Sequence, residues 1–306
     1  MIEAVKPVSF TLADEFAFAK ALGASFERHG FAVLEHHGLD EALNAAAAAD
    51  AKAIIALPET IKRRYRDPGG AGQRGYTPFG IETAKDAPHA DLKEFWHVGR
   101  EVSSGLSGLA PNLWPEEIPA FRSHMLDLYA ALEQVGARLL SAAALHLGLR
   151  ADAFEDSIAG GDSVLRLLHY PPATFEGPAL RAGAHEDINA ITLLLGAEEG
   201  GLEILDRDGR WLAINPPAGA LVVNIGDMLA RLTNDVLPST THRVVNPPPE
   251  RRGVARYSMP FFLHFRPDFL IETLPGCVSG DRPDRYPEPI TAGAFLQRRL
   301  REIKLA

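Results

Sequence analysis

The 306-residue chain is short of several features that would place it in other classes of protein. Its single cysteine, Cys277, cannot form an internal disulfide and fits a reducing compartment such as the cytoplasm. The chain has no run of about eighteen apolar residues, and its first residues lack the apolar core of a signal peptide, so we expect no membrane span. The formal net charge of −9 argues against a nucleic-acid surface, which needs a clustered basic face. What remains is a globular protein with enough apolar residues to bury a large core.

The first half of the chain has mostly helical patterns. Apolar residues recur at helical spacing in two segments, and alanine dominates a third. A glycine- and proline-rich stretch predicts a loop of the kind that often covers an active site. We expect helices at 11–29, 40–57 and 119–149, a strand at 31–34 and the loop at 67–80. Residues 1–160 are therefore predicted to form a helical and mixed region packed on the rest of the chain.

The second half changes to short strands separated by glycine and proline turns. Such a pattern favours a sandwich or barrel, and a double-sheet jelly roll is its closed-core version. The expected strands are 164–170, 190–195, 202–206, 211–214, 220–224, 242–245 and 256–265, followed by a final helix at 291–305. Residues 161–306 are therefore predicted to form the jelly-roll core.

One group of residue types suits a metal ion. His185 and Asp187 form a His-x-Asp pair just before an apolar run that predicts a buried strand, and His242 comes from a later predicted strand. Two imidazoles and one carboxylate on one face of a metal, with open positions opposite, are typical of non-haem Fe(II) oxygenases. A second pair, His89 and Asp91, lies in a stretch typical of a loop or helix start. We expect these two to be ordinary surface residues.

The alternation of a strand explains how the candidate ligands could meet. His185 and Asp187 are two positions apart and point the same way if the strand persists there, as do Arg256 and Ser258. Three facial ligands leave three positions on Fe(II): a 2-oxoacid takes two through its keto and carboxylate oxygens, and dioxygen takes the third. Arg256 can grip the far carboxylate of that acid in a bidentate fork, and Ser258 can add a hydroxyl.

Five segments that contain these residues match one family. They are Ala184-His185-Glu186-Asp187, Gly200-Gly201-Leu202-Glu203-Ile204, Asn224-Ile225-Gly226-Asp227, Thr241-His242-Arg243-Val244 and Arg256-Tyr257-Ser258. The chain resembles the isopenicillin N synthase-like 2-oxoglutarate/Fe(II)-dependent oxygenases over nearly its whole length. The resemblance implies a mostly β protein with flanking helices: a distorted double-stranded β-helix, or jelly roll, with iron at His185, Asp187 and His242.

The resemblance also implies a reaction. Arg256 and Ser258 would contact 2-oxoglutarate, and Tyr170 matches a tyrosine that contacts this co-substrate in relatives. The segment Leu168-His169-Tyr170-Pro171 departs from the Asn-Tyr-Tyr-Pro that is usual in plant members. We expect oxidation of a small organic molecule by dioxygen, with hydroxylation as the default outcome and release of succinate and carbon dioxide. Two alternatives stay open: an iron oxidase of the isopenicillin N synthase or ascorbate type, and a non-catalytic jelly-roll binding module.

The sequence says less about the substrate. Arg166 lies four positions before Tyr170, so it can face the same pocket and hold an acidic substrate, or it can form an ion pair at the barrel rim. Candidates for the pocket mouth are Phe79, Phe95, Trp96, His97, Asn189, Phe261 and Phe262. The sequence does not predict the oligomeric state.

Overall fold

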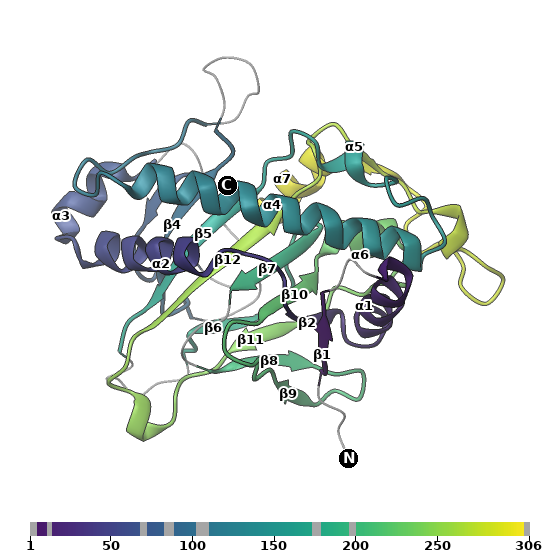
Figure 1. Cartoon of the computed structure of the whole chain (residues 1–306), viewed down its shortest axis with the longest axis horizontal. Coiled ribbons are helices and arrows are strands. Elements are labelled where there is room, and N and C mark those ends of the chain that lie inside the picture. The colour runs from purple at the N-terminus through teal and green to yellow at the C-terminus, as the bar shows by residue number, and fades with distance from the viewer. Residues whose placement is uncertain are drawn as a thin grey trace.

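The computed structural model describes residues 5–10, 14–67, 72–82, 89–101, 110–172, 179–195 and 200–302. Within these ranges, no helix has the length and apolar character needed to cross a membrane. The chain forms two main β-sheets, with helices on both sides (Figure 1).

The larger sheet has eight strands in the order β1-β2-β10-β7-β12-β5-β4-β3. Apart from the parallel pair β1–β2, its neighbouring strands are antiparallel. In that order the strands are Pro7–Ser9, Phe31–Glu35, Leu221–Ile225, Ile191–Leu195, Arg256–Leu263, Val164–Tyr170, Glu94–Gly99 and Gly75–Thr77.

The smaller sheet has four antiparallel strands in the order β6-β11-β8-β9. These are Ala182–His185, His242–Val244, Leu202–Leu205 and Trp211–Ala213, and a separate hairpin pairs β13 (Leu270–Ile271) with β14 (Ile290–Thr291). Side chains from both sheets line one common internal cavity, among them Tyr170 of β5 and His242 of β11. The architecture is the expected distorted double-stranded β-helix.

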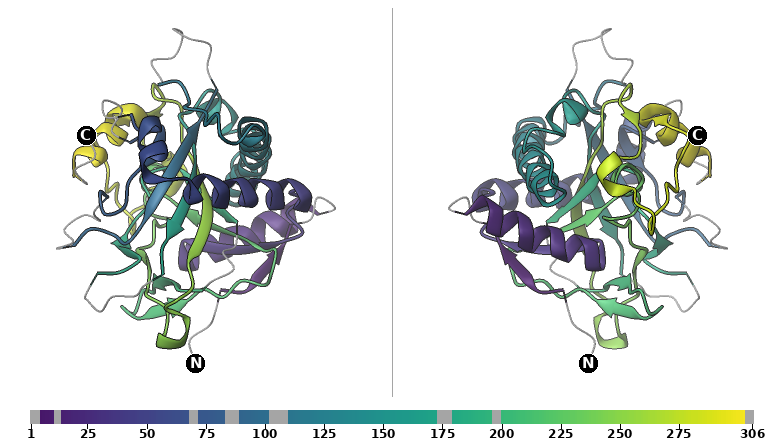
Figure 2. Two further views of the ribbon diagram at one scale, coloured as in Figure 1. Left: turned by 90° about the vertical axis from the view of Figure 1, so that its left-hand side faces the viewer. Right: turned by 90° about the vertical axis from the view of Figure 1, so that its right-hand side faces the viewer.

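The helices lie on two sides of the larger sheet. They are α1 (Glu15–His29), α2 (Glu41–Ala56), α3 (Glu59–Lys62), α4 (Phe121–His146), α5 (Glu155–Ile158), α6 (Asp227–Leu232) and α7 (Ala292–Glu302), with 3-10 turns at Arg63–Tyr65, Pro249–Arg251 and Pro275–Cys277. The long helix α4 backs the sheet at β7 and β12 and packs against α1 and α2. Figure 2 shows α4 and α7 on opposite sides of the sheet.

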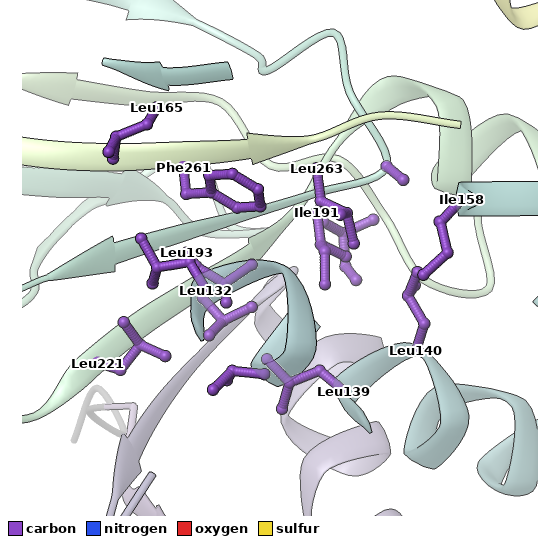
Figure 3. Packing of buried hydrophobic residues seen from close by; sticks show 14 of the residues in the cluster. Leu132, Leu139, Leu140, Ile158, Leu165, Ile191, Leu193, Leu221, Phe261 and Leu263 are labelled. Atoms are coloured by element: carbon purple, nitrogen blue, oxygen red, sulfur yellow. The ribbon is translucent and has the colours of Figure 1, made fainter. Parts of the chain in front are cut away.

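The core lies between α4 and the larger sheet. Strand alternation turns Leu193 and Phe261 toward the helix, where their side chains meet the apolar stripe of α4 (Figure 3). The rings of Tyr129 and Phe261 meet edge to face with centroids 4.9 Å apart. Gly136 lets the helix approach closely, because a Cβ there would already stand 3.0 Å from Leu263 Cδ2. This packing supports β12 and β7 from one side, and both strands border the cavity on their other face.

The ends of the predicted helices follow local capping chemistry. Asp14 and Asp40 accept hydrogen bonds from the first turns of α1 and α2. Gly30 ends α1 with a φ of 65°, a left-handed conformation that glycine adopts without strain. The expected helices and strands are all present, with ends within a few residues of the prediction. Residues 11–13 and 303–305 of two predicted helices lie outside the described residues.

Three local predictions of secondary structure were wrong in whole or in part. The stretch 67–80 was expected to be a loop, but Gly75–Thr77 form the strand β3. The stretch 91–94 was expected to be a loop or helix start, which holds for a loop at 91–93, but Glu94 opens the buried strand β4. The strand at His185 was expected to persist through Asp187, but β6 ends at His185. Asp187 therefore lies in the β6–β7 connection, so strand alternation does not explain its direction. The division of the chain at residue 160 stays a prediction, and β1 to β4 of the first part pair into the larger sheet.

Candidate active site

Three side chains converge where the two sheets meet. Asp187 Oδ1 lies 3.8 Å from His185 Nε2 and 3.8 Å from His242 Nε2. One ligand atom from each of the three residues lies within 4.8 Å of the others, a spacing that suits a single metal ion. His242 opens β11 directly opposite His185 at the end of β6, so the cross-strand pairing itself brings the two imidazoles together.

Hydrogen bonds on the far side of each group orient the three ligand atoms. His185 Nδ1 lies 2.7 Å from the Gly183 carbonyl oxygen, and His242 Nδ1 lies 3.1 Å from that of Thr240. A carbonyl only accepts, so each Nδ1 carries the proton and each Nε2 keeps its lone pair for a metal.

The carboxylate of Asp187 is held in a similar way. Its Oδ2 accepts hydrogen bonds from Thr192 Oγ1 at 2.5 Å and from Asn224 Nδ2 at 2.8 Å. Thr192 in turn accepts one from Asn189 Nδ2 at 3.1 Å, which fixes the direction of the hydroxyl. This chain leaves Oδ1 to face the two imidazoles. Outer hydrogen bonds that fix the tautomer and orientation of each ligand are characteristic of real metal centres, so the residues fit an Fe(II) ion.

The electrostatics favour the protonation states that bind a metal. Burial, together with the neighbouring His242, lowers the pKa of His185 to about 4, which keeps the imidazole neutral. Burial alone would raise the pKa of Asp187, but the two histidines and the hydrogen bonds from Asn224 and Thr192 outweigh it and lower that pKa. A neutral imidazole and an ionised carboxylate are the forms that coordinate metal.

An inner cavity lies between the sheets on one side of this triad, and its walls include Arg256, Ser258 and Tyr170. All three are buried, and Arg256 Nη1 donates a hydrogen bond to Ser258 Oγ at 3.2 Å. The guanidinium lies over the ring of Tyr170, with its carbon 5.1 Å from the ring centroid. Arg256 and Ser258 share one face of β12 as predicted, and β12 pairs Arg256 with Tyr170 on β5.

An outer cavity of about 390 Å³ lies on the other side of the triad. Five residues line both cavities, so the two meet at the triad: Lys93, Arg166, His185, Asp187 and Phe262. The far wall of the outer cavity comes from Leu296, Arg299 and Leu300 of α7. Arg299 joins this helix to the barrel through an ion pair with Asp227 at 3.1 Å.

The residues proposed for the pocket mouth divide between two faces of the sheet. His97, Asn189 and Phe262 line the outer cavity, whereas Trp96 and Phe261 belong to the core on the opposite face. Phe95 packs under the Arg166 guanidinium, and Phe79 is largely exposed. Arg166 does line the pocket, as the hypothesis that it faces the same pocket as Tyr170 required.

His89 and Asp91, the second His-x-Asp pair, were both expected at the surface, but only His89 lies there. His89 is exposed, but Asp91 is 4% exposed and lines the outer cavity. Its carboxylate accepts hydrogen bonds from Lys93 Nζ and from the backbone N–H of Gly183, in β6. The prediction that Asp91 is a surface residue was therefore wrong, because a neighbouring lysine neutralises a charge that otherwise would not be buried.

Several residues of the site were missed in the sequence. Glu82, Lys93 and Asp91 come from the segment around β4, which was not recognised as a strand. Thr192 and Asn224 were placed on strands but were given no role. The alternating pattern of β7 and β10 could have put both side chains on the cavity face, but their hydrogen bonds to Asp187 depend on the pairing of these strands.

The fold and the site together define a class, the non-haem iron oxygenases that use 2-oxoglutarate. Residues 161–265 match the model of the 2OG-Fe(II) oxygenase superfamily, and residues 5–117 match the model described as non-haem dioxygenase in morphine synthesis N-terminal. The chain belongs to the 2OG-Fe(II) oxygenase superfamily. It is a 2-oxoglutarate- and Fe(II)-dependent dioxygenase, and the isopenicillin N synthase-like assignment made from the sequence is confirmed.

Named relatives support this over most of the chain. The 2-oxoglutarate-Fe(II) type oxidoreductase hxnY of Emericella nidulans is 33% identical over 291 residues, which cover 89% of this chain and 82% of the relative. A 2OG-Fe(II) oxygenase family protein from Caulobacter crescentus has a solved structure with a TM-score of 0.92 and 59% identity, covering 99% of this chain and all of that one. A Neurospora crassa protein, solved at full length in complex with alpha-KG and thymine, has a TM-score of 0.87 and 29% identity over 96% of each chain.

Proposed function

We propose that this dioxygenase hydroxylates a small organic molecule and that His185, Asp187 and His242 hold its iron. The carrying observation is the arrangement of the triad, with two imidazole Nε2 atoms and one carboxylate oxygen directed at a common point by hydrogen bonds on their far sides. The overall reaction consumes the substrate, 2-oxoglutarate and dioxygen, and yields the hydroxylated product, succinate and carbon dioxide.

The residues around the triad supply orientation. When bound, Fe(II) and 2-oxoglutarate supply the activation of dioxygen and the electrons that the oxidation requires. Thr192 and Asn224 hold Asp187 ionised and fixed in direction, and the Gly183 and Thr240 carbonyls hold the two imidazoles in one tautomer. A site held this way needs little rearrangement when its ligands arrive.

Arg256, Ser258 and Tyr170 would hold the far carboxylate of 2-oxoglutarate. The guanidinium is 3% exposed, its direction is fixed by the Tyr170 ring below it, and it already shares a hydrogen bond with Ser258. A planar guanidinium pairs with a carboxylate through two parallel hydrogen bonds, and burial strengthens such a pair. The acid would thus be fixed at one end by Arg256, while its keto-acid end faces the triad.

The substrate would bind in the outer cavity. A volume of about 390 Å³ suits a small molecule rather than a folded partner, and the cavity borders the triad directly. The thymine in the Neurospora crassa complex supports a small substrate at this kind of site. We also propose that the enzyme works in the cytoplasm, since its one cysteine forms no disulfide, and that the chain divides at residue 160 as the strand pattern predicts.

Calorimetric titration of the Co(II)-loaded protein with 2-oxoglutarate tests this function. Co(II) takes the same donor set without turnover, so we expect one equivalent of 2-oxoglutarate to bind. Arg256→Ala should weaken this binding by about 30-fold or more, since truncating one partner of a buried charged pair costs on the order of 2–5 kcal/mol. Arg243→Ala is the control, because Arg243 lies outside both cavities and pairs with Glu203.

A second measurement separates this function from an oxidase that uses no 2-oxoglutarate. We expect succinate to form with Fe(II), dioxygen and 2-oxoglutarate, and a panel of small molecules should include some that stimulate its release. Unchanged 2-oxoglutarate affinity in Arg256→Ala would remove the clamp from the proposal. Substrate oxidation without succinate would replace the proposed reaction by the oxidase reaction.

A further inference from the structure

Four ionic side chains form one buried wall of the outer cavity: Glu82, Asp91, Lys93 and Arg166, called here the charged wall. Lys93 Nζ lies 2.6 Å from Glu82 Oε1 and 2.8 Å from Asp91 Oδ2. Arg166 Nη1 lies 3.2 Å from the same Glu82 oxygen. These side chains are only 5–14% exposed, yet all four line the cavity beside the triad.

The charges of the wall are present and cancel. Burial alone would raise the pKa of Glu82, but Arg166 and Lys93 outweigh it and hold that pKa far below its ordinary value. Burial opposes the charge of Lys93 in the same way, and the two carboxylates overcome this and raise its pKa. With an arginine that is always protonated, the wall carries two positive and two negative charges.

His97 lies beside the charged wall and is neutral. Its Nδ1 lies 2.6 Å from the Gly72 carbonyl oxygen and therefore carries the proton, so Nε2 accepts the hydrogen bond that Arg166 Nε donates at 2.6 Å. Burial, together with the charge of Arg166, lowers the pKa of His97 well below its ordinary value. The imidazole therefore fixes the direction of Arg166 without adding charge.

Among the residues that the structure describes, the cavity has no surplus cation for an acidic substrate. The other charged residues of this part of the chain that line the cavity are Glu186, Asp187 and Arg299, and Arg299 already pairs with Asp227 and Glu302. A carboxylate that entered would have to compete with Glu82 for Arg166 and Lys93, and would leave a buried negative charge unpaired. The alternative in which Arg166 holds an acidic substrate is therefore disfavoured.

One acceptor of the wall is unused. Glu82 Oε2 is buried and has no hydrogen-bond partner in the described parts of the chain, although Oε1 has two cationic neighbours. A buried carboxylate oxygen without a donor is costly, and a ligand N–H or O–H would remove that cost. The lining of the same cavity also includes Ile188, Leu296 and Leu300, which offer apolar surface.

We propose that the substrate is a neutral molecule in which an N–H or O–H donor stands beside a carbonyl acceptor, as in an amide, lactam or imide. This rests on the proposed function, because it assigns the outer cavity to the substrate. Glu82 accepts the hydrogen bond from the donor, Arg166 or Lys93 donates to the acceptor, and the apolar side of the molecule packs against α7. Glu82 is the residue that determines this specificity.

Matched pairs of neutral and acidic probes test the proposal. Each pair is titrated calorimetrically into the Co(II)-loaded, 2-oxoglutarate-bound protein: benzamide with benzoate, uracil with orotate, and cyclohexanecarboxamide with cyclohexanecarboxylate. We expect the neutral member of at least one pair to bind about tenfold more tightly than its acid, a difference of about 1.4 kcal/mol. Tighter binding of the acids, or no binding by any neutral member, overturns the proposal.

Two variants change the charge of the wall in opposite directions. Glu82→Gln leaves one net positive charge, so the preference should shift at least about tenfold toward the acids. Lys93→Met leaves one net negative charge, so benzamidine should bind better than benzamide. Glu203→Gln, which removes an equally paired carboxylate outside both cavities, should behave as the parent protein. An unchanged ratio in Glu82→Gln overturns the assignment of Glu82.

The 2-oxoglutarate titration distinguishes a failure of the proposed substrate class from a failure of the proposed function. If the parent protein and Glu82→Gln both bind 2-oxoglutarate normally but show no neutral preference, the substrate class is wrong and the proposed function stands. If the parent protein binds no 2-oxoglutarate, both fail together. Normal 2-oxoglutarate binding in Glu82→Gln and Glu203→Gln also shows that these variants are folded. Lys93 lines the inner cavity as well, so folding of Lys93→Met is checked by circular dichroism instead.

Discussion

The two cavities that meet at the triad are built in different ways. Arg256, Ser258 and Tyr170 of the inner cavity lie on the long strands β12 and β5, which α4 supports from behind. The outer cavity takes Glu82 and Asp91 from segments outside the named strands, and Arg299 from the C-terminal helix. Rigid strands suit the part of the reaction that a whole family shares, and connecting segments suit the part in which members differ.

The cavities also differ in charge. In the described parts of the chain, one lysine, arginine, aspartate or glutamate side chain lines the inner cavity but not the outer one, and it is that of Arg256. Those that line only the outer cavity are Glu82, Asp91, Glu186 and Arg299. The inner cavity thus adds a cation where a dicarboxylic acid would bind, whereas the outer cavity adds more acids than bases. Under the proposed function, this difference would direct an acidic co-substrate to the inner cavity and a neutral substrate to the outer one.

Removal of a triad ligand should have the largest effect, because the triad lies where the two cavities meet and would hold the metal that both binding sites need. His185→Ala should lower metal affinity and turnover by more than about 100-fold, since even outer-shell changes at metal centres cost about 10- to 100-fold. Equilibrium dialysis with Co(II) and a succinate assay measure the two effects. His89→Ala is the matched control from the second His-x-Asp pair. An equal loss in both variants would contradict the assignment of the triad.

The inner cavity was largely predictable from the sequence, for a physical reason. Arg256 and Ser258 lie two positions apart in an apolar run, and a strand turns such a pair to one face whatever its neighbours are. His242 was predicted from the local sequence pattern to begin a strand, and it does begin β11. Asp187 was chosen by residue type and does lie beside the two imidazoles, but the geometric reason was incorrect, because β6 ends before it. Its direction comes from Thr192 and Asn224.

Loss of one support of Asp187 should have the next largest effect. Thr192→Val keeps the shape of the side chain but removes the hydroxyl that donates to Asp187 Oδ2. Metal affinity should fall by about tenfold, while the hydrogen bond from Asn224 remains. Thr241→Val is the control from the outer cavity, where the hydroxyl contacts Glu186 instead. Competition for Co(II) with a chelator measures the metal affinity of both variants. An equal loss of affinity in both would contradict a specific role of the Thr192 hydroxyl.

The long-range polar contacts of the outer cavity could not be predicted, because they join residues far apart in the chain. Arg166 pairs with Glu82 across 84 positions, and Asp91 contacts Gly183 across 92. A buried charge looks like a surface charge in the sequence until its partner is known, and this is why Asp91 was misplaced. Lys62 is a similar case: it lies in a basic run that suggests a solvated helix end, but it is 6% exposed and pairs with Glu94.

Glu94 lies on the face of β4 that points away from the outer cavity and is hydrogen-bonded to His169, Lys62 and Tyr76. A change at Glu94 therefore tests whether a buried charge near the site serves stability or binding. Burial would raise the pKa of Glu94, but hydrogen bonds from His169, Lys62 and Tyr76 lower it to about 2. The ionised group therefore stabilises the fold above its unfolded pKa, and this contribution disappears as the pH falls toward 2.

Glu94→Gln should accordingly lower the free energy of unfolding by about 1–3 kcal/mol at pH 7. Urea denaturation of the variant and the parent should show this difference shrinking below about pH 4.5, the ordinary range of a glutamate. The preference for neutral probes should not change, in contrast to Glu82→Gln. A changed preference would mean that the two faces of β4 are not independent.

The smallest effect should come from the far wall of the outer cavity. Arg299→Ala removes the ion pair that joins α7 to Asp227, so Leu296 and Leu300 should be held less firmly against the substrate. The pair is partly exposed, so we expect only about a threefold rise in the KM for substrate, with the KM for 2-oxoglutarate unchanged. Arg298→Ala, on the exposed side of the same helix, should change neither constant. A rise in the KM for 2-oxoglutarate would show that α7 also supports the inner cavity, and the separation between the two cavities would then fail.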